Sequence, residues 1–424
     1  MKGSTITKVF AYEGYSNRGQ ACVVAHVETA NGAVGIGAYS SGLSVGPYEA
    51  PFLYDGDDRF DGKGMRKAVA NVNNILGPAL IGKDASLQAD CDSLILEFGK
   101  KEMGANATAS LSTAILHAGA LSQGIPLYRH IGGVRGFTLP LPSHNAATGS
   151  VRYGGPVSAG HKPTYSFVAY GFEDYDEAAY SLWELTMDWG GVLTERLGIK
   201  MQIENGFAIP KNKLKDDFEL WEMMADLIHK KGDDGKIGLQ VDMGANGFYD
   251  LEKRTYKGLF DCRERSRDEL IALVCKMPDE YPFVVIEDPL MADDFEGFAT
   301  ITEETGIQIV GDDLFASNPE RLRKGIEMHA GNCILVSVSQ IGSVSEAFEV
   351  ALLAHENDFA TTVSESRGEE TDICDYAVGL NCSTIREGGL SFTGNRLMSI
   401  HDDVGKRMKF FGKEGLKGSR FAMR

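Results

Sequence analysis

Three acidic residues follow three separate apolar runs in the second half of the chain. Asp242 lies in KIGLQVDMG, Glu287 in YPFVVIEDP and Asp312 in IQIVGDDL. One carboxylate at such a place could simply cap the next helix, but three in succession indicate a shared role. Carboxylate oxygens that converge from several strands suit Mg²⁺ or another hard divalent ion, and without an ion their repulsion would raise their pKa values. We predict a metal cage, in which the neighbouring Asp288 and Asp313 orient other groups by hydrogen bonding.

The spacing of these acids indicates the architecture that positions them. Five apolar runs end at 242, 287, 312, 337 and 366, so the successive steps are 45, 25, 25 and 29 residues. Steps of roughly 25–30 residues fit one strand, one helix and two loops, which favours a parallel (β/α) barrel with its active site at the carboxyl ends of the strands. The longer first step leaves room for an insertion. A doubly wound open sheet is the alternative, although no GxGxxG follows a strand to support its dinucleotide-binding form.

The first third of the chain has a different pattern, an antiparallel sheet followed by helices. Strand-like alternation covers 5–12, 21–29 and 33–39. Helical periodicity covers 64–76, 86–98 and 106–123. A pair of glycines and a pair of prolines then interrupt the chain, and we place the boundary at about 135–140. The expected domains are therefore 1–137 and 138–424.

Composition restricts the partners. The chain has 42 basic and 60 acidic residues, a net charge of -18, which argues against a nucleic acid or an anionic membrane as partner. No apolar run approaches the roughly 20 residues that span a bilayer, and the first residues lack the apolar stretch of a signal peptide. Seven cysteines without a CxxC motif suit a reducing compartment. We expect a cytoplasmic protein that binds neither nucleic acid nor membrane.

Motifs along nearly the whole chain resemble one known family. The acidic runs continue as VDMGANGFYD, VIEDPL and VGDDLFASNPER, and VSQIGSVSEA follows them. The first half contains, in the family's order, SNRGQACVV, SSGLSVGPYEA, GKGMRKAVANVN and GIPLYRHIGG, and IENGFAIP comes later. Each motif is weak by itself, but the collinear set extends from about residue 5 to residue 403. The chain is identified as a member of the enolase superfamily, close to the enolases.

The resemblance implies a fold and a set of residue roles. The fold is α/β, a modified (β/α)8 TIM barrel with an N-terminal α+β capping domain. The implied ligands of the first Mg²⁺ are Asp242, Glu287 and Asp312. Ser44 would reach a second Mg²⁺ from a lid loop, and Glu204 would be the general acid on the departing hydroxyl. The family removes a proton next to a metal-bound carboxylate, and the resulting enediolate expels a β-leaving group.

The chain departs from the family at the catalytic base. Ser337 stands at the catalytic position where the resemblance calls for a lysine, and a hydroxyl is not a competent base without a partner of its own. Thr164 stands where a second catalytic carboxylate is expected. The candidates for a substitute base are His161, Lys162 and Glu365.

Further departures concern anion binding. Arg386 replaces a lysine and is expected to be both a catalytic and a substrate-binding residue. Ser366 and Arg367 occupy the places of an arginine and a serine, and Arg152 falls near a histidine position. Because guanidinium presents a planar fork to carboxylate or phosphonate, we predict that Arg152, Ser366, Arg367 and Arg386 bind the substrate.

These features predict a Mg²⁺-dependent lyase that eliminates water, or a similar β-leaving group, from a small anionic phospho- or phosphono-carboxylate. The alternatives are an ordinary phosphopyruvate hydratase with a rewired base, a carboxyphosphonoenolpyruvate synthase, and a non-catalytic enolase-like binding protein. The retained Ser44, Glu204 and metal triad argue against the last of these.

A homodimer or higher homo-oligomer is expected from the resemblance. The arginine and glutamate that commonly pair across the enolase dimer correspond to Ser399 and Val24. Both partners are missing together, which is compatible with a repacked dimer or with another oligomer.

Overall fold

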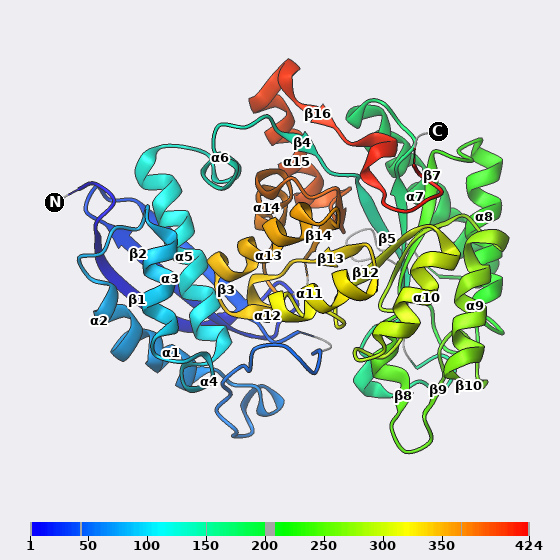
Figure 1. The fold of residues 1–424 in the computed structure, drawn as a ribbon, viewed down its shortest axis with the longest axis horizontal. Coiled ribbons are helices and arrows are strands. Elements are labelled where there is room, and N and C mark those ends of the chain that lie inside the picture. Colours follow the sequence, from blue (N-terminus) through cyan, green and yellow to red (C-terminus); the bar gives the residue numbers. More distant parts are fainter. Residues whose placement is uncertain (1, 43–44, 150, 200–207, 366, 423–424) are drawn as a thin grey trace.

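The computed structural model describes residues 2–42, 45–149, 151–199, 208–365 and 367–422. Within these ranges, no helix combines the length and the apolar character that crossing a membrane requires. Figure 1 shows the N-terminal elements, in blue and cyan, beside the later elements, which run from green to red.

The N-terminal part is a three-stranded antiparallel sheet that packs on one long helix (Figure 1). The strands are β1 (Ile6–Tyr15), β2 (Ala21–Thr29) and β3 (Val34–Ser40). The helix is α5 (Ala105–Gln123), which is almost entirely buried and rich in small side chains. A Cβ atom on Gly35 would lie 2.0 Å from the Ala114 carbonyl oxygen, so only glycine permits this close contact between strand and helix.

The helices around this sheet lie close to the predicted ranges. The segment predicted as one helix over 64–76 is interrupted by a π-helical turn at Val72–Leu76. The helices are α1 (Arg66–Asn71), α2 (Gly77–Leu80), α3 (Gln88–Leu96), α4 (Lys100–Met103) and α6 (Leu127–Gly132).

The second part is a nearly closed eight-stranded sheet in the order β15-β14-β13-β12-β11-β7-β6-β5. These strands are β5 (Ser143–Thr148), β6 (Thr164–Ala169), β7 (Ile237–Asp242), β11 (Phe283–Glu287), β12 (Gln308–Gly311), β13 (Cys333–Leu335), β14 (Ala360–Ser364) and β15 (Thr384–Arg386). A parallel bridge between Leu141 and Thr384 spans the two ends of the sheet. The predicted modified barrel is confirmed, and the open doubly wound sheet is wrong.

Two features make the barrel irregular. β6 runs antiparallel to both of its neighbours, whereas the pairs from β7 to β15 are parallel. A small antiparallel sheet accounts for the long 45-residue step between the first two acidic strand ends. Its strands are β8 (Tyr249–Asp250), β9 (Thr255–Lys257) and β10 (Glu264–Ser266).

Helices follow the barrel strands, and polar side chains begin most of them. They are α7 (Tyr175–Leu197), α8 (Asp217–Lys231), α9 (Arg267–Glu280), α10 (Phe295–Thr305), α11 (Pro319–Met328), α12 (Val338–Ile341), α13 (Val344–Glu356), α14 (Asp372–Leu380) and α15 (Ser391–Val404). Ser266 and Glu269 form a reciprocal capping box at the start of α9, which satisfies backbone N–H groups that the helix leaves unpaired. Near the C-terminus, β16 (Lys409–Phe410) pairs with β4 (Thr138–Leu139).

Polar contacts join the N-terminal part to the mouth of the barrel. The Lys100 ammonium donates to the Ile341 carbonyl and to Glu346, both at 2.8 Å. The backbone N–H of Ser40, at the end of β3, donates to the Arg367 carbonyl at 2.8 Å. The segment after β3 continues this contact, because the Ala50 N–H donates to the Gln340 carbonyl at 2.7 Å. The carboxyl ends of the barrel strands therefore face the N-terminal part.

Candidate active site

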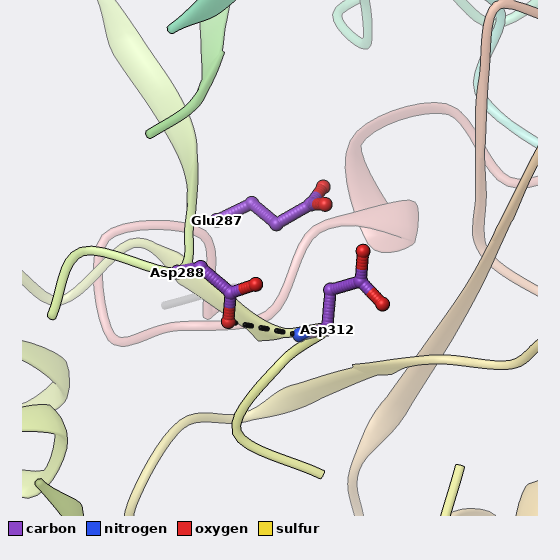
Figure 2. A group of neighbouring side chains, drawn as sticks. All are labelled: Glu287, Asp288 and Asp312. Carbon is purple, nitrogen blue, oxygen red and sulfur yellow. Dashed lines mark hydrogen bonds between the residues drawn. The ribbon is translucent and has the colours of Figure 1, made fainter. Parts of the chain in front are cut away.

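Three carboxylates gather where β11 and β12 end (Figure 2). One oxygen each from Glu287, Asp288 and Asp312 can be chosen so that all three lie within 4.8 Å of one another. Asp242 ends the adjacent strand β7 and lies in register with Glu287. The acids that the sequence placed at successive strand ends are therefore together at one end of the barrel.

Asp288 holds the backbone that carries its neighbours. Its carboxylate accepts the N–H of Asp312 at 3.1 Å, drawn as the dashed line in Figure 2, and the N–H of Asp313 at 2.7 Å. Its φ of 45° lies in the left-handed region, which is strained for a residue with a side chain and is often maintained at functional sites. Asp288 contributes to the acidic cluster and fixes the loop after β12.

Two cations enter the acidic cluster from other strands. The Arg386 guanidinium, at the end of β15, pairs through Nη1 with Asp242 and with Glu287, the latter at 2.7 Å. Its Nε donates to Ser364 Oγ at 2.8 Å. The Lys162 ammonium, just before β6, also pairs with Asp242. The carboxylate of Asp242 is thus engaged by both cations.

Burial and like charge shift the pKa values of this cluster. Burial raises the pKa of Glu287, and the nearby Arg386 only partly offsets it. Burial, followed by the charges of Asp312 and Glu49, raises the pKa of Asp313 to about 7. Burial and the charge of Arg386 lower the pKa of Lys162. Burial and, to a lesser extent, the charges of neighbouring carboxylates therefore oppose the ionisation of Glu287 and Asp313.

The residues present fit a hard divalent cation. The Glu287 Oε2 atom is buried and has no hydrogen-bond partner among the described residues. A cavity of about 50 Å³ lies in the same acidic cluster, lined by Lys162, Asp242, Asp288, Asp312, Asp313 and Val45, among others. That space can hold at least one water-sized group, since by the same measure roughly 10–15 Å³ is enough for a water. An orphaned carboxylate oxygen near a small acidic cavity is a donor set that Mg²⁺ prefers.

A chain of hydrogen bonds connects the serine at 337 to the metal cage. Ser317 Oγ accepts the Ser337 N–H at 2.9 Å and donates to the Gln340 side-chain oxygen at 2.8 Å. The Gln340 amide in turn donates to Asp312. Ser337 Oγ shares a 3.0 Å hydrogen bond with Ser339 Oγ, so its hydroxyl contacts another hydroxyl rather than a base. This arrangement positions Asp312 and gives Ser337 no means of taking a proton.

The structure places two predicted substrate-binding arginines against other partners. Arg152 pairs with both oxygens of Asp217 at 2.8 and 3.0 Å, at the start of α8. Arg367 pairs with Glu49 from the N-terminal part. Their roles in substrate binding stay predictions. Burial lowers the pKa of Arg367, but the charge of Glu49 and, to a lesser extent, that of Asp312 raise it above its ordinary value.

The predicted substitute bases separate in the structure. His161 is exposed, and its carbonyl accepts the Gly149 N–H at 3.1 Å. Lys162, the next residue, reaches the cage. Glu365 pairs with Arg18 at 2.8 Å. Thr164 is buried and lies opposite Asp242 in the register of β6 and β7.

Three predicted site residues, Ser44, Glu204 and Ser366, lie outside the described residues. Sequence reasoning gave no role to Gln340 or to Glu49. Its spacing could have identified Gln340. It follows Ser337 by three residues, which is about one helical turn, so in a helix the two side chains lie on the same side. No comparable signal marks Glu49, whose partner lies 318 residues away along the chain.

A small α+β part beside a nearly closed barrel, with carboxylates at successive strand ends, defines an α/β barrel protein with a candidate metal centre. The family model for the N-terminal domain of enolase matches residues 6–131, and the model for the C-terminal TIM barrel domain of enolase matches residues 138–419. The chain therefore belongs to the enolase family.

Curated relatives agree along almost the full length. The enolase of Methanopyrus kandleri is 40% identical over 423 residues, which cover 96% of this chain and 97% of that protein. The enolase of Thermococcus gammatolerans is 38% identical, covering 94% and 95%. That of Methanocaldococcus jannaschii is 36% identical, covering 94% and 96%. Family membership places the chain among the carbon–oxygen lyases of the enolase type, which generally use Mg²⁺.

Proposed function

We propose that this protein is a Mg²⁺-dependent hydro-lyase whose substrate is a small phospho- or phosphono-carboxylate other than the usual enantiomer of 2-phosphoglycerate. The observation that carries this proposal is the convergence of Lys162 and Arg386 on Asp242 inside the acidic cluster. The chain retains an amine and a guanidinium at the cage although residue 337 is a serine.

The direction from which the amine enters supports a changed substrate. Residue 337 follows β13 and Lys162 precedes β6, and these strands lie four places apart in the eight-stranded order. They therefore face each other across the barrel. An amine at 162 approaches a substrate in the cage from the side opposite to one at 337, and so meets the opposite face of the carbon that loses the proton.

The proposed reaction assigns a step to each group. Asp242, Glu287 and Asp312 would hold the ion, which supplies positive charge beside the substrate carboxylate when it is bound. Lys162 Nζ takes the proton from the carbon next to that carboxylate. The electron pair forms a carbon–carbon double bond as the β carbon–oxygen bond breaks, and the departing hydroxyl takes a proton and leaves as water. Glu204 is the proposed donor of that proton, and Arg386 binds the anionic group.

Turnover tests this proposal. The purified protein is given Mg²⁺ and a panel that contains both enantiomers of 2-phosphoglycerate and hydroxylated phosphonocarboxylates, and the new double bond is followed by ultraviolet absorbance. We expect elimination from a member of the panel other than the usual enantiomer of 2-phosphoglycerate. Lys162→Met should abolish it, whereas the exposed Lys257→Met should not. Loss in His161→Gln, with activity kept in Lys162→Met, would assign the base to the histidine.

A second candidate is ordinary phosphopyruvate hydratase with Lys162 as a rewired base. The curated relatives named enolase, at 36–40% identity over nearly the whole chain, favour it. A rate within the typical enzyme range of about 1–10³ s⁻¹ on the usual enantiomer of 2-phosphoglycerate would establish this candidate and refute the first. A carboxyphosphonoenolpyruvate synthase is the most specific form of the first candidate. Inactivity towards every compound, with Mg²⁺ still bound, would indicate a binding protein.

We also propose a cytoplasmic homo-oligomer that acts on a small anionic substrate. All seven cysteines are free, which suits a reducing compartment. Light scattering coupled to size-exclusion chromatography tests the oligomer, because a monomeric mass at micromolar concentration would contradict it.

A further inference from the structure

The metal cage already contains positive charge supplied by the chain itself. Arg386 Nη1 contacts Asp242 and Glu287, and Lys162 Nζ contacts Asp242. Two of the three acids proposed as metal ligands are therefore paired with cations. Both cationic side chains are shielded from solvent, with 8% of the Arg386 side chain and 16% of the Lys162 side chain exposed.

We propose that Arg386 and Lys162 are internal counter-ions that the divalent ion must displace, and that the displaced Arg386 guanidinium then binds the anion of the substrate. Metal and anion would consequently bind with positive coupling. This inference depends on the metal site of the proposed function, but it does not depend on which compound is turned over.

The first step follows from competition for the same oxygens. Mg²⁺ binds carboxylate oxygen at about 2.0–2.1 Å and tolerates little distortion of its octahedral shell. The Asp242 and Glu287 oxygens that pair with Arg386 lie within hydrogen-bond distance of its guanidinium, so an ion bound to them would lie close to that guanidinium. Like charges at such a distance repel strongly in a buried site. The cations must therefore move away for the ion to bind well.

Glu287 offers the ion a place to begin. Its Oε1 pairs with Arg386, but its buried Oε2 has no hydrogen-bond partner among the described residues. Asp312 is held by the Gln340 amide and not by either cation. An ion can thus contact Glu287 and Asp312 before it displaces Arg386 and Lys162 from Asp242.

The second step follows from what displacement leaves behind. Arg386 stays anchored through its Nε donation to Ser364 Oγ at 2.8 Å, whereas Nη1 loses its carboxylate acceptors. A buried guanidinium without an acceptor is costly, and an anionic group would remove that cost. Because coupling between two ligands is reciprocal, the ion should strengthen anion binding by the same factor by which the anion strengthens ion binding.

Calorimetry with Mg²⁺ alone tests the displacement. We expect Arg386→Met to bind Mg²⁺ at least about 10-fold more tightly than the unmodified protein, since the variant has no guanidinium to displace. Lys162→Met should shift affinity in the same direction, and Arg386→Lys, which keeps the charge, should stay near the unmodified value. Arg396→Met is the matched control, because Arg396 pairs with Asp375 away from the cage. Its affinity should not change.

Inorganic phosphate tests the coupling. In the unmodified protein, phosphate should tighten Mg²⁺ binding several-fold and Mg²⁺ should tighten phosphate binding equally, and Arg386→Met should lose most of this effect. Unchanged or weaker Mg²⁺ binding in Arg386→Met and Lys162→Met, or no coupling to phosphate, would overturn the proposed displacement of the cations. It would leave the metal site and the proposed function untouched. Absence of Mg²⁺ binding in every protein would overturn the metal site and the proposed function with it. Circular dichroism shows whether each variant is folded. If Arg386→Met is unfolded, the Mg²⁺ affinities of Lys162→Met and Arg386→Lys test the displacement instead.

Discussion

Two buried charge clusters in the barrel differ in how their charges balance. At the start of α8, the Arg152 guanidinium binds both oxygens of Asp217, and the Tyr165 hydroxyl donates to the same carboxylate at 2.6 Å. One positive charge meets one negative charge there. At the strand ends, the described residues of the cage include five carboxylates and two cations. The acids are Asp242, Glu287, Asp288, Asp312 and Asp313, and the cations are Lys162 and Arg386.

The difference separates a structural cluster from one built to bind. A buried ion pair with matched charges and a further hydrogen bond needs nothing from outside the chain. A cluster with three more acids than cations stays short of positive charge. Only the second cluster can gain from a divalent ion.

The largest expected effect tests the balanced cluster. Arg152→Met leaves the buried Asp217 carboxylate without its counter-charge, and we expect the free energy of unfolding to fall by about 3–5 kcal/mol. Urea denaturation measures it. Arg263→Met is the control, since Arg263 is largely exposed and its pair with Asp261 should contribute about 0–1 kcal/mol. If stability hardly changes and the KM for substrate rises instead, Arg152 is the substrate ligand that the sequence suggested.

The next effect tests the unbalanced cluster. Glu287→Gln removes the orphaned oxygen and one negative charge, and we expect Mg²⁺ affinity to fall at least about 100-fold by calorimetry, beyond the range for residues that only support a ligand. Stability without metal should stay level or rise, because repulsion is relieved. Asp217→Asn should instead lower the free energy of unfolding and leave the Mg²⁺ affinity unchanged. Mg²⁺ binding that survives Glu287→Gln would exclude this carboxylate from the metal site.

The sequence predicted the fold well because local patterns carried it. Apolar runs that end in acids at regular steps correspond to β7, β11 and β12, and each ends within one residue of its acid. The antiparallel direction of β6 was not predictable, because an apolar run such as TYSFVA has the same pattern in either direction. Direction is fixed by the pairing with β5 and β7, which is a property of the whole sheet.

Of the site residues, only the positions of the acids could be predicted from the sequence. Asp242, Glu287 and Asp312 follow from strand periodicity, since parallel strands end at the same edge. The partners of the basic residues depend on contacts far apart in sequence. Arg152 pairs with Asp217 and Arg367 pairs with Glu49. A long arginine side chain can reach any acid that the fold places nearby, so its partner cannot be inferred from local sequence. Lys162 could not be distinguished from its exposed neighbour His161 by spacing.

A smaller effect tests how the cage is positioned. Gln340→Leu removes the amide that donates to Asp312 but leaves all the carboxylates in place. We expect Mg²⁺ affinity to fall by about 10-fold, the lower end of the range for residues that orient a metal ligand. Gln308→Leu is the matched control, because Gln308 is also buried on the barrel sheet but donates to Thr384 at 3.4 Å. Equal Mg²⁺ affinities in the two variants would show that Asp312 needs no such support.

The smallest effect concerns a carboxylate outside both clusters, whose pKa shifts in the opposite direction. Hydrogen bonds from Ser4 and Ser86 lower the pKa of Asp84 from 3.8 to about 2. A carboxyl group with a depressed pKa in the folded protein contributes stability above its unfolded pKa and loses it as the pH falls towards the folded value. Asp84→Asn should therefore cost about 1 kcal/mol at pH 5, and this difference should shrink steadily between about pH 4 and pH 2.

Urea denaturation across that pH range measures the difference, with Asp90→Asn as the control for removing an exposed carboxylate from the same region. Glu287, Asp288 and Asp313, whose pKa values burial raises, would give the opposite slope, because a group with a raised pKa gains stability from protonation where Asp84 loses it. A difference that grows as the pH falls would place Asp84 with the crowded acids and remove the distinction between hydrogen-bonded and repelled carboxylates in this protein.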